Sequence, residues 1–131
     1  MRKTKILCVE DHADSAELVV VLLGQYEVTV ATCISEAMTF AANGRFDLFL
    51  FDYHLPDGNG VELLASLLEV DKKALVVFMT ASTRLTRNEA RRLGAVDLLN
   101  KGRVSFTSDL VDLVGRTIPA SVPESSPAVP Y

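Results

Sequence analysis

Five short apolar runs alternate with five stretches in which apolar residues recur at helical spacing. The runs predict β-strands at Lys5–Val9, Tyr26–Ala31, Phe46–Phe51, Ala74–Met79 and Ala95–Leu99. The stretches predict helices at Ser15–Leu23, Ile34–Ala42, Gly60–Glu69, Thr83–Leu93 and from Ser105 or Thr107 to Ile118. Strict alternation of strands and helices is typical of a parallel sheet with helices on both faces. The strands show little period-2 alternation, which is expected when both faces of a sheet are covered.

Polar residues mark several helix starts. Asp14 followed by Glu17, and Asn59 followed by Glu62, have the spacing of capping boxes. The fourth helix is expected to be capped either at Thr83 or at Thr86 with Glu89.

The composition changes at Pro119. Four of the five prolines lie in residues 119–131, together with several serines and almost no core-forming residues. Such a segment cannot bury enough apolar area to offset its ordering entropy. We therefore expect one domain over residues 1–118, followed by a disordered tail or the start of a linker over residues 119–131.

The charge and the apolar runs limit the classes of partner. The 131 residues carry a net charge of −4, which argues against direct nucleic acid binding. No apolar run is long enough for a signal peptide or a membrane span, so we expect a cytoplasmic protein that does not bind membranes. Cys8 and Cys33 lack metal-ligand spacing and are expected to be reduced.

Polar side chains occur at the carboxyl ends of four of the five predicted strands. Glu10 and Asp11 follow the first strand, Asp52 the third, Thr80 the fourth and Lys101 the fifth. In open parallel sheets, ligands bind outside the carboxyl ends of the strands. These side chains would converge at one edge if the first and third strands are neighbours.

This set of side chains favours phosphoryl chemistry. Three close carboxylates repel one another and attract a cation, and oxygen donors favour Mg²⁺ or Mn²⁺. A lysine and a hydroxyl can hold the oxygens of a phosphoryl group. A carboxylate that faces the group can attack it and become an acyl phosphate, and Asp52 is placed for that role. Pro56 and the glycines beyond it allow a sharp turn.

The five positions together resemble the receiver domain of bacterial two-component response regulators, in particular the chemotaxis-regulator type. The resemblance rests on Glu10-Asp11, Asp52 with Pro56 and Gly60, Thr80-Ala81, and Lys101, and it covers roughly residues 4–118. It implies a flavodoxin-like doubly wound (βα)5 fold with a five-stranded parallel sheet of order 2-1-3-4-5.

The resemblance also implies a role for each matching residue. Asp52 is the expected phosphoacceptor. The implied ligands of Mg²⁺ (or Mn²⁺) are Glu10, Asp11, Asp52 and the main-chain carbonyl of His54. The residues expected to contact the phosphoryl group and take part in switching are Thr80, Ala81 and Lys101. His54 and Ser82 are expected to tune the rate of dephosphorylation.

Partners follow from the same resemblance. The phosphoryl donor would be a sensor histidine kinase, a histidine phosphotransfer protein or a small acyl phosphate, and the phosphorylated domain would control an unknown output. The chain would catalyse only its own phosphorylation and dephosphorylation, as a monomer or a weak, phosphorylation-promoted dimer. The candidates for a partner surface are Arg84, Arg87, Arg91 and Leu98, although such arginines most often form a solvated helix face.

Two positions depart from the family pattern. Gly102 follows Lys101 where the family has a proline after a cis bond, and Leu98 replaces an aromatic residue. A cis bond without proline costs about 2.5–4 kcal/mol, so either the bond is trans or the site holds strain. Both departures leave open a receiver-like interaction module with weakened or absent phosphorylation control.

Two further alternatives are weaker. A haloacid-dehalogenase-type phosphatase would need a second aspartate where this chain has His54. A zinc site at His12 and His54 is disfavoured by the acids beside them, which suit harder metals.

Overall fold

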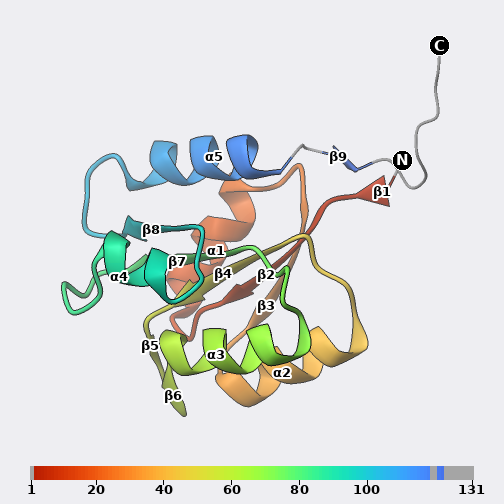
Figure 1. Ribbon diagram of the computed structural model, residues 1–131. Coiled ribbons are helices and arrows are strands. Elements are labelled where there is room, and N and C mark those ends of the chain that lie inside the picture. The colour runs from red at the N-terminus through yellow and green to blue at the C-terminus, as the bar shows by residue number, and fades with distance from the viewer. Residues whose placement is uncertain (1, 119–120, 123–131) are drawn as a thin grey trace.

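The computed structural model describes residues 2–118 and 121–122. Its centre is a sheet of five parallel strands in the order β3-β2-β4-β7-β8 (Figure 1). These strands are β2 (Lys5–Val9), β3 (Glu27–Ala31), β4 (Leu48–Asp52), β7 (Val76–Thr80) and β8 (Asp97–Asn100). Numbered among themselves, the five strands have the order 2-1-3-4-5, so the predicted fold class is confirmed.

Five helices cover the two faces of this sheet. They are α1 (Ala13–Leu22), α2 (Ile34–Asn43), α3 (Gly60–Val70), α4 (Arg87–Arg92) and α5 (Phe106–Thr117). Helices α1 and α5 pack on one face, whereas α2 and α3 cover the other (Figure 1). None of these helices, nor any other in the described part of the chain, has the length and apolar character needed to cross a membrane.

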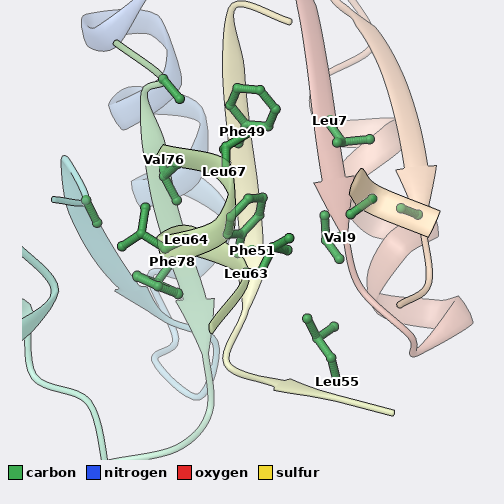
Figure 2. Close-up of a cluster of buried hydrophobic side chains, with 14 of the residues drawn as sticks. Leu7, Val9, Phe49, Phe51, Leu55, Leu63, Leu64, Leu67, Val76 and Phe78 are labelled. Carbon is green, nitrogen blue, oxygen red and sulfur yellow. The ribbon is translucent and has the colours of Figure 1, made fainter. Parts of the chain in front are cut away.

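The apolar strands divide between two cores because alternate side chains point to opposite faces. In β4, Phe49 and Phe51 point toward α3, where they join Leu63, Leu64 and Leu67 (Figure 2). The intervening Leu48 and Leu50 belong to the core beneath α1 and α5. All of β4 and β7 is buried, so the continuous apolar runs of the sequence reflect strands that are covered on both sides.

Two predicted helix starts need correction. Helix α1 begins at Ala13, with His12 as an N-cap that makes no side-chain bond, so the predicted capping box at Asp14 is wrong. Helix α4 begins at Arg87, later than the predicted Thr83. The main-chain N–H groups of Ser82 and Arg84 bond to the hydroxyls of Thr80 and Ser82, and such local bonds compete with a helix.

The other two predicted caps agree with the structure. Asn59 with Glu62 forms a complete capping box on α3, and Thr86 with Glu89 forms one on α4. The latter selects Thr86 from the two caps that the sequence allowed.

Two short strand pairs add to the predicted elements. Strand β5 (His54–Leu55) pairs with β6 (Gly58–Asn59) in a hairpin directly after β4. Strand β1 (Arg2–Lys3) pairs antiparallel with β9 (Ser121–Val122). Apart from Ser121 and Val122, the predicted tail over residues 119–131 lies outside the described residues, and its disorder stays a prediction.

Candidate phosphoryl-transfer site

Three carboxylates meet at the carboxyl edge of the sheet because β2 and β4 are neighbours. Glu10 and Asp11 follow β2, and Asp52 is the last residue of β4. One carboxylate oxygen from each of the three lies within 4.8 Å of the others, close enough to hold a metal ion. Glu10 and Asp52 are buried, whereas Asp11 is exposed. The convergence predicted from the strand ends is therefore observed.

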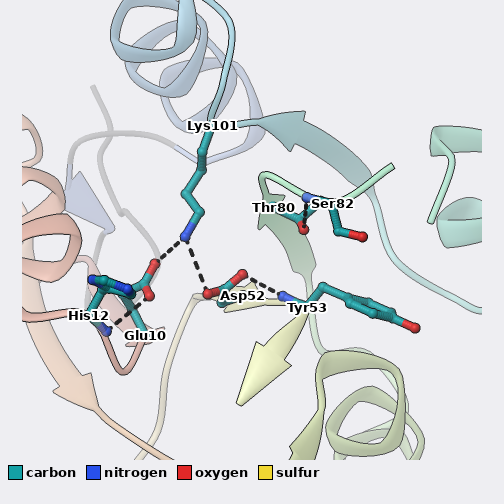
Figure 3. A network of polar contacts seen from close by, with 7 residues as sticks. All are labelled: Glu10, His12, Asp52, Tyr53, Thr80, Ser82 and Lys101. Carbon is teal, nitrogen blue, oxygen red and sulfur yellow. Dashed lines mark hydrogen bonds and ion pairs between the residues drawn. The ribbon is translucent and has the colours of Figure 1, made fainter. Parts of the chain in front are cut away.

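Lys101 links two of these acids (Figure 3). Its Nζ lies 2.6 Å from Glu10 Oε1 and 3.2 Å from Asp52 Oδ2. Burial raises the pKa of the Glu10 carboxyl, and the hydrogen bond from Lys101 offsets that rise only in part. Burial acts to lower the pKa of Lys101, but the hydrogen bond and charge of Glu10, with Asp52, outweigh it, so this pKa is raised. The ammonium group therefore stays charged in the site.

The backbone around Asp52 fixes its side chain from the other side. The main-chain N–H of Tyr53 donates to Asp52 Oδ1 at 2.7 Å. Helix α3 begins close by, and the N–H of Gly60 donates to the carbonyl of Tyr53 at 2.7 Å. A Cβ on Gly60 would lie only 2.5 Å from the carbonyl oxygen of Asp52, so this close approach needs glycine.

Thr80 and Lys101 come together through the pairing of β7 with β8. Thr80 is fully buried, and its hydroxyl oxygen accepts a 2.9 Å bond from the N–H of Ser82 (Figure 3). The N–H of Lys101 donates to the carbonyl of Thr80 at 2.9 Å. The Thr80 hydroxyl is thus held by the loop that leads to α4, so a change in its position would be felt by that loop.

A cleft of about 420 Å³ opens over these groups. Its lining residues are Asp11, His12, Asp52, His54, Leu55, Pro56, Ala81, Ser82 and Lys101. The cleft gives a small anionic group access to the carboxylate of Asp52 and the ammonium group of Lys101. A larger hollow of about 650 Å³ lies between the ends of α2 and α3 and contains none of the predicted site residues.

The side chains of the two histidines are not part of the acidic cluster. The main-chain N–H of His12 donates to Glu10 Oε2 at 3.2 Å. The ring of His54 packs edge-on against the ring of Tyr53, with the centroids 4.8 Å apart. Among the described residues, the group that could hold a metal consists of carboxylates alone, which does not suit zinc.

The arginines predicted as a partner surface are partly used within the chain. Arg87 Nε lies 2.7 Å from Asp97 Oδ1, and Arg91 binds the same oxygen at 3.5 Å. Arg87 also donates to the carbonyl of Leu98 at 3.3 Å. Arg84 is exposed, and the side chain of Leu98 packs against the core beneath α2 and α3. These bonds join α4 to β8 but leave more than half of each of the two arginine side chains exposed.

Sequence reasoning missed three contributions to the site. The N–H groups of His12 and Tyr53 hold carboxylates through the main chain, which leaves no mark on the residue types. Asp57 accepts bonds from the N–H groups of Ile34 and Ser35 at 2.8 and 3.1 Å, so it caps α2 from the loop after Asp52. The Pro-Asp-Gly turn pattern around Asp57 signals a turn but not its distant partner.

Comparison with known proteins agrees with this geometry. The family profile of the response regulator receiver domain matches residues 6–110. The response regulator protein PilR of Pseudomonas aeruginosa is 34% identical over 104 residues, which cover 77% of this chain and 23% of PilR. The transcriptional regulatory protein DpiA of Escherichia coli is 33% identical over 101 residues, covering 73% of this chain and 45% of DpiA. The chain thus spans less than half the length of these relatives.

The fold is also similar to solved receiver structures. The non-phosphorylated HemR receiver domain from Leptospira biflexa superposes with a TM-score of 0.80 and 31% sequence identity. The match covers 94% of this chain and 100% of that domain.

Proposed function

Because this chain belongs to the response regulator receiver domain family, we propose that Asp52 is the residue that accepts a phosphoryl group. The observation that carries the proposal is the contact of the buried Asp52 carboxylate with Lys101, at an edge where two further acids meet. Receiver domains are signalling switches, and here the phosphorylated Asp52 would be the switched state.

The transfer step follows from the position of Asp52 in the cleft. A carboxylate oxygen of Asp52 attacks the phosphorus of a phosphohistidine or of a small acyl phosphate. The P–N or P–O bond breaks, and its electron pair leaves with the imidazole or the carboxylate of the donor. The product is an acyl phosphate on Asp52. Lys101 and Thr80, with the main chain at Ala81, would contact the phosphoryl oxygens as charge moves onto them.

The acidic cluster fits a divalent cation with a preference for oxygen ligands. Glu10, Asp11 and Asp52 supply three carboxylates, and the exposed Asp11 leaves room for solvent, as Mg²⁺ prefers. When bound, Mg²⁺ (or Mn²⁺) supplies positive charge that neutralises the phosphoryl oxygens. We assign Glu10, Asp11, Asp52 and the main-chain carbonyl of His54 as its protein ligands. Lys101, which now neutralises Glu10 and Asp52, would then serve the phosphoryl group.

Switching would begin at Thr80. For its hydroxyl to donate to a phosphoryl oxygen, the side chain must turn into the cleft, and the bond from the Ser82 N–H would change with it. That change would reach the loop before α4. His54 and Ser82 line the cleft, so we propose that they govern the access of water to the acyl phosphate and hence its lifetime.

We propose the partners from the chemical groups that they would offer. The donor would be a histidine kinase or a histidine phosphotransfer protein, since both offer a phosphohistidine. The output would be a separate partner or a further domain. The exposed parts of Arg84, Arg87, Arg91 and Leu98 are a candidate surface for it.

Incubation with Mg²⁺ and acetyl phosphate, followed by intact-mass measurement, tests the proposal. We expect one phosphoryl group to be added to the native protein and none to Asp52→Asn. The control is Asp112→Asn, which removes an exposed carboxylate of α5 and should leave the addition unchanged. Equal addition to Asp52→Asn would show that another residue is the acceptor. No addition to the native protein would favour the interaction module without phosphorylation control.

A further inference from the structure

The turn that follows β8 is built on the side chain of Asn100. Asn100 Oδ1 accepts a 2.7 Å bond from the N–H of Gly102, which forms an Asx turn around Lys101. The carbonyl of the same asparagine accepts a bond from the N–H of Arg103 at 3.2 Å. Asn100 therefore closes the turn with both its side chain and its main chain.

Lys101 is the residue enclosed by this turn. Its N–H is fixed to the carbonyl of Thr80 in β7, and the Asx turn holds the residue that follows it. Its side chain extends from there to Glu10 and Asp52 across the cleft. A long lysine side chain has many rotamers, so the direction in which the backbone presents it limits where the ammonium group can lie.

Gly102 and Asn100 act as a pair. A Cβ on residue 102 would lie 3.2 Å from Asn100 Oδ1 and would crowd the carboxamide, so glycine gives the side chain room to approach. Proline at this position would remove the N–H that the Asx turn requires. Among the described residues no peptide bond is cis, so the Lys101–Gly102 bond is trans. The hydrogen bond of Asn100 thus shapes a turn that lacks proline.

We propose that Asn100 is a positioning residue that aims Lys101 at Asp52 by means of its bond to the Gly102 N–H. The consequence for phosphoryl transfer rests on the proposed function of Asp52. The effect of Asn100 on the position of the Lys101 ammonium group is independent of that proposed function.

The test combines phosphorylation rates with NMR of Lys101 in four variants. Asn100→Ala removes the acceptor, and Asn100→Asp retains one. Gly102→Pro removes the N–H donor, and the fourth variant combines Gly102→Pro with Asn100→Ala. Asn88→Ala, an exposed asparagine of α4, is the control. The rate with acetyl phosphate and Mg²⁺ is measured over a range of donor concentrations, and the side-chain shifts of Lys101 are recorded without metal.

We expect Asn100→Ala to lower the maximal rate by about two- to tenfold, as for the loss of one hydrogen bond, and to move the Lys101 shifts. Asn100→Asp and Asn88→Ala should stay near the native values. In the Gly102→Pro background, Asn100→Ala should add no further effect, because the bond is already absent.

Lys101 shifts that do not move in Asn100→Ala would overturn the inference. So would a loss of rate on Asn100→Ala that is as large in the Gly102→Pro background as in the native protein. If neither the native protein nor any variant gains a phosphoryl group, the proposed function is wrong. The Lys101 shifts then decide the role of Asn100 on their own: movement in Asn100→Ala but not in Asn100→Asp supports it.

Discussion

At the scale of single residues, the site contains more negative charge than its one ammonium group can neutralise. Lys101 contacts Glu10 and Asp52, whereas Asp11 lies beside them with its side chain exposed. Buried like charges cost stability unless a cation relieves them. A divalent metal that binds here should therefore stabilise the folded chain.

We predict that Mg²⁺ raises the melting temperature of the native protein and that Asp11→Asn removes most of this rise. Binding to the folded state alone adds about 2.7 kcal/mol when the free metal is at 100 times its dissociation constant. Thermal unfolding monitored by circular dichroism over a Mg²⁺ series measures the effect. Asp14→Asn, an exposed residue of α1, is the matched control. A full metal response in Asp11→Asn would exclude Asp11 as a ligand.

At the scale of elements, the segment after Asp52 is fastened to a neighbouring helix. Helix α2 receives no side-chain cap from its own N-cap residue, Cys33. Asp57, between β5 and β6, supplies the cap through the N–H groups of Ile34 and Ser35. Hydrogen bonds therefore join the loop that follows the candidate phosphoacceptor to the start of α2.

Asp57→Ala should lower stability at neutral pH, and the loss should depend on pH. The bond from the Ile34 N–H, with that from Ser35, holds the pKa of Asp57 below its usual value. The carboxylate thus stabilises the folded state above the unfolded pKa, and this contribution disappears as pH falls through the folded pKa. Urea unfolding should separate the two proteins at pH 7, and the difference should begin to narrow as pH falls below about 4 and disappear below the lowered pKa of Asp57. A difference in the free energy of unfolding that stays constant with pH would contradict this cap. Asp112→Ala serves as the control.

The connection between α4 and β8 affects how far the conformational response to phosphorylation extends. Leu98 packs against the core where the family has an aromatic residue, and Arg87 binds both Asp97 and the carbonyl of Leu98. Leucine gains less than an aromatic residue from turning inward, and the extent of a population shift is limited by such differences. We expect the response to concentrate in the loops after Thr80 and Lys101.

The measurement is the change in amide chemical shifts on adding Mg²⁺ with a beryllofluoride mimic of the acyl phosphate. Shifts across α4 and β8 should be small in the native protein and larger in Leu98→Tyr. Large shifts there in the native protein, unchanged by the substitution, would refute the idea.

The boundaries that sequence reasoning missed share a physical origin. Apolar periodicity identified every strand of the main sheet, because burial on both faces leaves a continuous run in the sequence. The early start of α4 was wrong because hydrogen bonds in the loop, such as that of the Ser82 N–H to Thr80, compete with a helix. The Asp14 cap was wrong because α1 begins at Ala13, with His12 as its N-cap. Periodicity also carries no information on which strands are neighbours, and the strand order came from the family resemblance.

At the scale of the whole molecule, the described residues form one five-stranded sheet between two cores, with two short strand pairs beside it. Large exposed apolar side chains are spread over α1, α3, α5, the end of α4 and the turn after β8. We expect the unphosphorylated protein to be a monomer, with at most weak dimerisation on phosphorylation. Sedimentation velocity over a concentration series tests this. A tight dimer without phosphate would show that one of these surfaces is already an interface.

The central claim is that Asp52 itself receives the phosphoryl group, and borohydride trapping tests it most directly. Borohydride reduces an aspartyl phosphate to homoserine and leaves a free carboxylate unchanged, so tandem mass spectrometry can identify the residue. After treatment with acetyl phosphate and Mg²⁺, we predict homoserine at position 52 alone, and none when the metal is chelated. A reduced residue at another acid, or the same yield at position 52 without divalent metal, would contradict the account.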